Sequence, residues 1–260
     1  MRSVLLTFAI CGLAQPAAAQ FATTYTGTQT EGSAAVPASA LFYVDPDHAL
    51  MIMKGARSGR MVFDAKAHVL HMINDDNRTY FDIDKSAGGG GDPMQMMQQQ
   101  LASLPPSQRA MAEGMMKSMS SSLPPPLTYV WSTETKTVAG YECTRVDGMR
   151  GGEKVTEYCG STSPDLKMTD AERKTMLEMQ SYLRNFTIMV KSGSDDTRAF
   201  QWDTSTDGYP VITRCYRNGV MTLDLALQSV SRKPVPADAL VLPDGYKRMD
   251  LTGMGGRPGR

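Results

Sequence analysis

Alternating apolar and polar positions predict a series of short β-strands in the first third of the chain. Runs rich in β-branched and aromatic residues are separated by Gly, Asp, Asn and Lys turn residues, which is typical of an antiparallel meander. Residues 21–39 are a low-complexity stretch of Thr, Gly, Ser and Ala, expected to form a partly ordered lead-in. The expected strands are residues 41–44, 49–54, 60–65, 68–73 and 79–83.

Helical spacing of apolar residues predicts a first helical insertion at residues 88–126. Four glycines open this segment, Asp92 and Pro93 suit the start of a helix, and prolines end each of its two helices. Methionines occupy the apolar positions of both helices: Met94 and Met97 in the first, and Met111, Met115 and Met119 in the second.

A second helical insertion is predicted for residues 163–185, where Thr169 and Glu172 form a capping-box pattern. Strands are expected at residues 127–136, 187–190, 199–203, 211–217 and 220–230; residues 240–246 close the fold, and residues 252–260 form a disordered tail. The apolar stripe of the second helix consists of Met176, Met179, Leu183 and Phe186.

These patterns together predict an α+β fold for residues 20–251. We expect a single antiparallel, strongly curved sheet, open as a half-barrel, with the two helical insertions described above. An open sheet leaves one apolar face uncovered, and the two insertions are the elements available to cover it.

A hairpin is predicted at residues 138–161, where two β-rich runs flank a glycine-rich break. A three-residue loop at residues 150–152 places Cys143 opposite Cys159 and Arg145 opposite Glu157, so that cysteine and charge pairs support one register. A two-residue turn at Gly151 and Gly152 would instead place Cys143 opposite Gly160. We favour the first register, which predicts a Cys143–Cys159 disulfide that leaves Cys215 as a thiol.

The first 19 residues have the features of a secretory signal peptide. Arg2 precedes an apolar run at residues 4–14, which is too short to span a bilayer as a helix. Small residues then predict cleavage before Gln20, with an uncleaved anchor as the less favoured alternative. The mature chain is expected in the periplasm or outside the cell, where disulfides persist, with no transmembrane segment.

Charge and motif content argue against several function classes. Removal of Arg2 leaves 26 of the 27 basic residues against 27 acidic ones, a net charge of −1 that gives no case for nucleic-acid binding. His68 and His71 lie three apart in a strand-like run and are expected on opposite faces, and His48 is isolated. Neither a Gly-x-Ser-x-Gly nor a His-Glu-x-x-His motif occurs. We therefore predict no enzymatic activity, no catalytic residues and no cofactor.

Short motifs resemble a family of exported bacterial proteins with a domain of unknown function. The matching segments are residues 59–64, 136–143, 208–211 and 242–247. That family is similar in layout to the periplasmic lipoprotein carriers of the Lol system. The resemblance implies an open antiparallel half-barrel whose helices lie over an apolar concave face that cradles acyl chains. It supplies no catalytic residues.

The methionine-rich helices suggest two kinds of binding. Unbranched, polarizable side chains form deformable apolar surfaces, so we expect Met94, Met97, Met111, Met115, Met119, Met176 and Met179 to line the lid of a site for a lipid, an acyl chain or an apolar segment of an envelope partner. Thioethers also suit Cu(I), and Met111, Met115 and Met119 are the weak candidate ligands for it. A closed structural module without a ligand is the third possibility.

Overall fold

The computed structural model describes residues 20–56, 58–84, 127–189 and 208–249, with Pro105, Arg109 and Pro125. For residues 185–189 the structure describes the backbone only. The first half of the sheet comprises β1 (Phe21–Glu31), β2 (Ala34–Val44), β3 (His48–Lys54), β4 (Gly59–Asp64), β5 (Val69–Asn74) and β6 (Thr79–Ile83). The other half comprises β7 (Leu127–Val138), β8 (Tyr141–Arg150), β9 (Glu153–Ser161), β10 (Tyr209–Arg217) and β11 (Val220–Ser231), and the short β12 (Lys247–Arg248) lies beside β6 at the edge of the first half.

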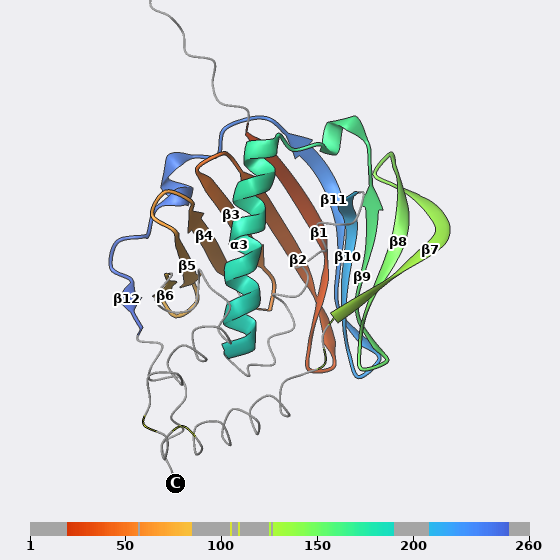
Figure 1. The fold of residues 1–260 in the computed structure, drawn as a ribbon, viewed down its shortest axis with the longest axis horizontal. Helices are drawn as coiled ribbons and strands as arrows, with labels where there is room; N and C mark the ends of the chain where they lie inside the picture. The colour runs from red at the N-terminus through yellow and green to blue at the C-terminus, as the bar shows by residue number, and fades with distance from the viewer. Residues whose placement is uncertain are drawn as a thin grey trace, which may run out of the picture.

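All twelve strands belong to one sheet, in the order β12-β6-β5-β4-β3-β2-β1-β11-β10-β9-β8-β7. Every neighbouring pair is antiparallel except β12 and β6, which are parallel, so the sheet is mixed. Two meanders, β1 to β6 and β7 to β11, meet where β1 pairs with β11. The sheet is open, with β12 and β7 as its edges (Figure 1).

The helix α3 (Asp170–Met189) crosses one face of the sheet over β2 and β3 (Figure 1). It begins with the predicted capping box: the Thr169 amide donates to Glu172 Oε2 at 2.7 Å, and the Glu172 amide donates to Thr169 Oγ1 at 3.3 Å. Arg232 pairs with the buried Glu172 carboxylate at 3.2 Å, so the cap is also tied to the end of β11.

Apolar side chains of α3 fill the space between the helix and the sheet. The Tyr182 ring packs on Phe63 with centroids 5.1 Å apart, and its hydroxyl donates to the His68 carbonyl at 2.8 Å. Met176 and Met179 are 2% and 1% exposed and belong to the main core. This part of the apolar face is therefore occupied by the protein's own side chains.

The segment after β11 covers the other face of the first meander. Leu240, Leu242 and Tyr246 pack against a smaller core that includes Tyr43 and Leu50. The segment contains the short 3-10 helix η4 (Ala237–Leu240) and ends in β12, which pairs with β6. Both faces of the first meander are thus covered by apolar contacts.

The expected α+β class with two helical insertions is wrong, because the structure is mostly β and its described part contains one long α-helix. The stretch at residues 21–39 forms β1 and much of β2 in the middle of the sheet. Small and β-branched side chains form strands there because β1 is paired on both sides, so tertiary context decides their conformation. Residues 187–189, expected to begin a strand, continue α3. The expected insertion 88–126, strand 199–203, leader 1–19 and tail 252–260 lie outside the continuous described ranges.

The meander from β3 to β6 confirms the strand pattern closely. β6 has the predicted bounds, and β3 begins one residue before them. The Arg217-Asn218-Gly219 turn between β10 and β11 is also present, with positive φ at Asn218 and Gly219.

Candidate functional site

An open cleft of about 740 Å³ lies at the end of the sheet where β7, β8 and β9 meet. One wall comes from the β7–β8 hairpin, and the other comes from the chain as it leaves β9. The β7–β8 turn is tight because Ala139 and Gly140 both have positive φ, of 51° and 86°. The cleft is formed mainly by two chain segments that the hairpin and the sheet hold in place.

The β7–β8 wall combines apolar residues with the polar Glu142 and Thr144. Trp131 on the edge strand β7 is 53% exposed, and it pairs across the strands with Val146 on β8. Tyr141 and the disulfide-bonded Cys143 of β8 also line the cleft. A large aromatic side chain left half in solvent beside an open cleft is a common feature of binding surfaces.

The opposite wall is polar and runs from Gly160 to Pro164, with Gly208 beside it. The Ser163 amide donates to Ser161 Oγ at 3.4 Å, which turns the chain towards the short helix η2 (Pro164–Leu166). A Cβ on Gly208 would lie 2.7 Å from the Gly160 carbonyl carbon, so only glycine permits the close approach of these backbones.

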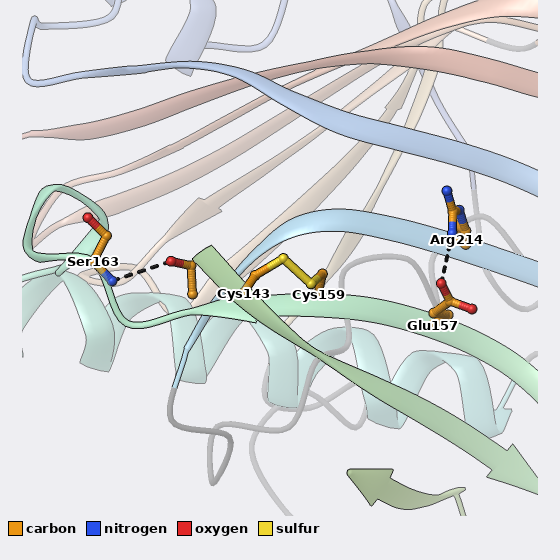
Figure 2. Close-up of a disulfide and its surroundings, with 6 residues drawn as sticks. Cys143, Glu157, Cys159, Ser163 and Arg214 are labelled. Carbon is orange, nitrogen blue, oxygen red and sulfur yellow. Dashed lines mark hydrogen bonds and ion pairs between the residues drawn. A yellow bond between two sulfur atoms is a disulfide. The ribbon is translucent and has the colours of Figure 1, made fainter. Parts of the chain in front are cut away.

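The disulfide joins Cys143 on β8 to Cys159 on β9, with their Cα atoms 5.3 Å apart (Figure 2). In Figure 2, Ser163 lies on one side of it and the Glu157–Arg214 pair lies on the other. The sulfur pairing was therefore predicted correctly. Cys215 is outside the disulfide, as predicted, and is buried in β10.

The strand register that led to this disulfide was wrong. The turn consists of Gly151 and Gly152, with Arg150 opposite Glu153, and a bulge after Gly148 shifts the pairing further. Cys159 consequently faces Arg145, and the disulfide links diagonal neighbours. Diagonal side chains on one sheet face remain within reach of each other, so the same cysteines pair in another register.

A row of charged side chains crosses four strands on the side of the disulfide away from Ser163 (Figure 2). Asp147, Glu157, Arg214 and Asp224 are directly opposite one another on β8, β9, β10 and β11. Arg214 contacts Glu157 at 2.8 Å and Asp224 at 3.0 Å, and Lys154 pairs with both Asp147 and Glu157. These ion pairs join the hairpin of the cleft to the centre of the sheet.

Glu157 is the buried member of this row. Burial alone would raise its pKa, but hydrogen bonds and charge attraction from Lys154 and Arg214 outweigh it and hold the pKa below 4.5, the ordinary value. The carboxylate therefore remains ionised at neutral pH as a structural partner of two cations.

We predict that replacing Glu157 with Gln removes an acid-sensitive part of the protein's stability. Because the folded-state pKa of Glu157 is depressed, its contribution is present above about pH 4.5 and is lost as the pH falls through the folded-state value. At neutral pH the substitution should cost roughly 2 kcal/mol, since Lys154 and Arg214 lose a charged partner. Urea unfolding from neutral to acidic pH measures this. If the free energy of unfolding depended on pH equally in the variant and the wild type, the role given to Glu157 would be contradicted.

The three histidines bind different carboxylates and do not come together. His48 Nδ1 lies 3.3 Å from Asp45, His68 Nδ1 lies 2.6 Å from Glu178 on α3, and His71 Nδ1 lies 2.7 Å from Asp82. His68 is in a turn with φ 54° rather than in a strand. The prediction that His68 and His71 lie on opposite faces of one strand was therefore wrong. Within the described ranges, no group of three or more His, Cys, Asp or Glu side chains is arranged to hold a metal ion.

Two of the seven predicted lid methionines, Met176 and Met179, are described, and they do not line the cleft. Met176 and Met179 lie under α3 in the main core. Met94, Met97, Met111, Met115 and Met119 lie outside the described residues, so their predicted roles stay predictions. Sequence reasoning missed Trp131 and the Ser161–Ser163 segment. The sequence offered one signal for the β7–β8 wall, namely Trp131 in a strand pattern that continues with polar residues.

No protein-family model and no curated protein matches this chain. Among solved structures, it is similar to an uncharacterized conserved protein from Thermus thermophilus, with 8% identity and a TM-score of 0.44, over 90% of this chain and 91% of that one. It is also similar to PNGF-II, with 10% identity and a TM-score of 0.41, over 92% of this chain and 32% of PNGF-II. Likenesses this distant carry no conclusion about activity.

Proposed function

We propose that this protein is an exported, non-enzymatic binding protein that holds an apolar ligand, such as a lipid or an acyl chain, in the cleft beside the disulfide. The observation that carries the proposal is the exposed Trp131, which forms an apolar wall with Val146 in an open cavity of about 740 Å³. Concave sites with apolar walls and a few polar groups are the usual form of small-ligand sites. An apolar segment of an envelope partner would use the same wall.

Export is part of this proposal. A disulfide at Cys143–Cys159 supports an oxidising compartment, and the apolar leader supports cleavage before Gln20. No helix in the described ranges is long and apolar enough to cross a membrane. N-terminal sequencing of the mature protein should begin at Gln20, and a start at Met1 would contradict export by cleavage.

Binding of an environment-sensitive apolar fluorophore tests the proposed site. We expect the mature protein to bind the probe and Trp131→Gln to weaken binding about tenfold, which corresponds to about 1.4 kcal/mol of lost apolar contact. The matched control is Met221→Gln. Met221 is 40% exposed on β11 and does not line the cleft, so its replacement should leave the affinity unchanged. Equal affinities in the wild type and the Trp131 variant would contradict this site.

The methionine-rich segment is assigned the deformable cover in this proposal. Replacing Met111, Met115 and Met119 together with Gln should weaken probe binding, because the cover would lose its apolar contacts. Absence of probe binding in both proteins, with Cu(I) binding lost in the variant, would favour the copper-binding alternative. If the protein bound neither the probe nor Cu(I), the closed structural module would be favoured.

A further inference from the structure

Hydroxyl-bearing side chains from both walls are frequent in the described lining of the cleft. Four hydroxyl-bearing residues, Thr144, Ser161, Thr162 and Ser163, line the cleft beside Gly160 and Gly208, and the Ser161 hydroxyl accepts a hydrogen bond from the Ser163 amide. Hydroxyls both donate and accept hydrogen bonds, so they match groups that do the same. Among the described residues, the cleft lining includes no Arg or Lys, the side chains that commonly bind carboxylates and phosphates.

Among the described residues of the cleft lining, Glu142 is the one acidic side chain, and it is exposed at the rim. A carboxylate accepts hydrogen bonds from hydroxyl groups but repels an anion. The nearby cation Arg145 is committed elsewhere, with Glu134 at 3.2 Å and Asp147 at 3.6 Å. Lys136 lies opposite Cys143 on β7, but it is exposed and outside the lining.

We infer that the ligand of this cleft is an amphiphile with an uncharged, hydroxyl-bearing head group, such as a glycerol or glycosyl group on an alkyl or acyl chain. This inference rests on the proposed function, because the chain of the amphiphile lies on the Trp131–Val146 wall. The head group lies against Thr144 and the Ser161–Ser163 segment, where each hydroxyl finds a donor or an acceptor. Glu142 at the rim disfavours fatty-acid carboxylates and lipid phosphates by charge repulsion.

Three amphiphiles with the same dodecyl-length chain test this inference by displacing the bound fluorophore. They are monolaurin, laurate and dodecyltrimethylammonium, used below their micelle concentrations at about pH 8, where laurate is ionised. Monolaurin should bind at least about tenfold more tightly than laurate, because Glu142 repels the laurate carboxylate and no cationic side chain in the described lining pairs with it. Dodecyltrimethylammonium should bind more weakly than monolaurin, since its head group has no hydrogen-bonding atoms.

Two variants separate the charge effect from the hydroxyl effect. Glu142→Gln should raise laurate affinity by about two- to fivefold, as expected for an exposed charge, and leave monolaurin within about twofold. Thr144→Val keeps the side-chain shape but removes a hydroxyl, so it should weaken monolaurin by about two- to tenfold, which is more than it weakens laurate. Trp131→Gln should weaken all three amphiphiles alike.

The outcomes distinguish this inference from the function it rests on. Laurate binding as tight as monolaurin would overturn the inference but leave apolar-ligand binding intact. Laurate binding tighter than that of monolaurin, if it were lost in Lys136→Gln, would show an anion site at the rim. That result would also overturn the inference and leave apolar-ligand binding intact. If no amphiphile displaced the probe, or Trp131→Gln had no effect on any of them, the proposed function itself would fail and the inference with it.

Discussion

Replacing Cys143 and Cys159 together with Ser lowers the free energy of unfolding by roughly 3 kcal/mol. The two cysteines are 16 residues apart in sequence, and their bond closes the β8–β9 hairpin into a loop. In the chain-entropy model, removing this constraint gives the unfolded chain more conformations and so favours unfolding. Equilibrium urea unfolding of the oxidised wild type and the double variant measures the difference.

The control for this experiment is the reduced wild-type protein. Reduction should produce the same loss as the double variant, whereas reductant should not change the variant. Because Cys143 is part of the cleft wall, we also expect weaker probe binding in the double variant at temperatures where it remains folded. A loss of stability below about 1 kcal/mol would mean that ion pairs and strand hydrogen bonds hold the hairpin without the disulfide.

Replacing Gly27 with Ala destabilises the fold by about 3 kcal/mol. Gly27 lies opposite Leu225 where β1 pairs with β11, the junction that joins the two meanders. A Cβ at Gly27 would lie 1.8 Å from the carbonyl oxygen of Asp224. Backbone atoms cannot rotate out of the way as a flexible side chain does, so the strands must move apart at this junction.

Thr26→Ala is the matched control for the Gly27 variant. Thr26 is the exposed neighbour on β1, and truncation of its side chain should change the stability by no more than about 0.5 kcal/mol. Urea unfolding of both variants checks the prediction. If Gly27→Ala unfolded at the wild-type midpoint, the close approach of β1 to the Asp224 backbone would be refuted.

Local patterns in the sequence were sufficient for the elements whose partners are close in sequence. The strands from β3 to β6, the Asn218-Gly219 turn and the Thr169–Glu172 capping box were all predicted, because each depends on residues within one hairpin or one helical turn. The Cys143–Cys159 bond was predicted for the same reason. Its register was wrong because the chain uses the two-residue Gly151–Gly152 turn that we had disfavoured, and the bulge after Gly148 then shifts the pairing by one more residue.

The sequence by itself thus determined the local strands and turns, the start of α3 and the pair of cysteines that bond. Only the tertiary structure decided that residues 21–39 form central strands, because β1 gains its stability from β11, roughly two hundred residues away in the chain. It also decided where the cleft lies, since Trp131 and Ser163 come from separate segments whose approach depends on the twist of the sheet and on the Gly160–Gly208 contact. Contacts between such distant segments depend on the packing of the whole chain, and no local period of apolar residues records them.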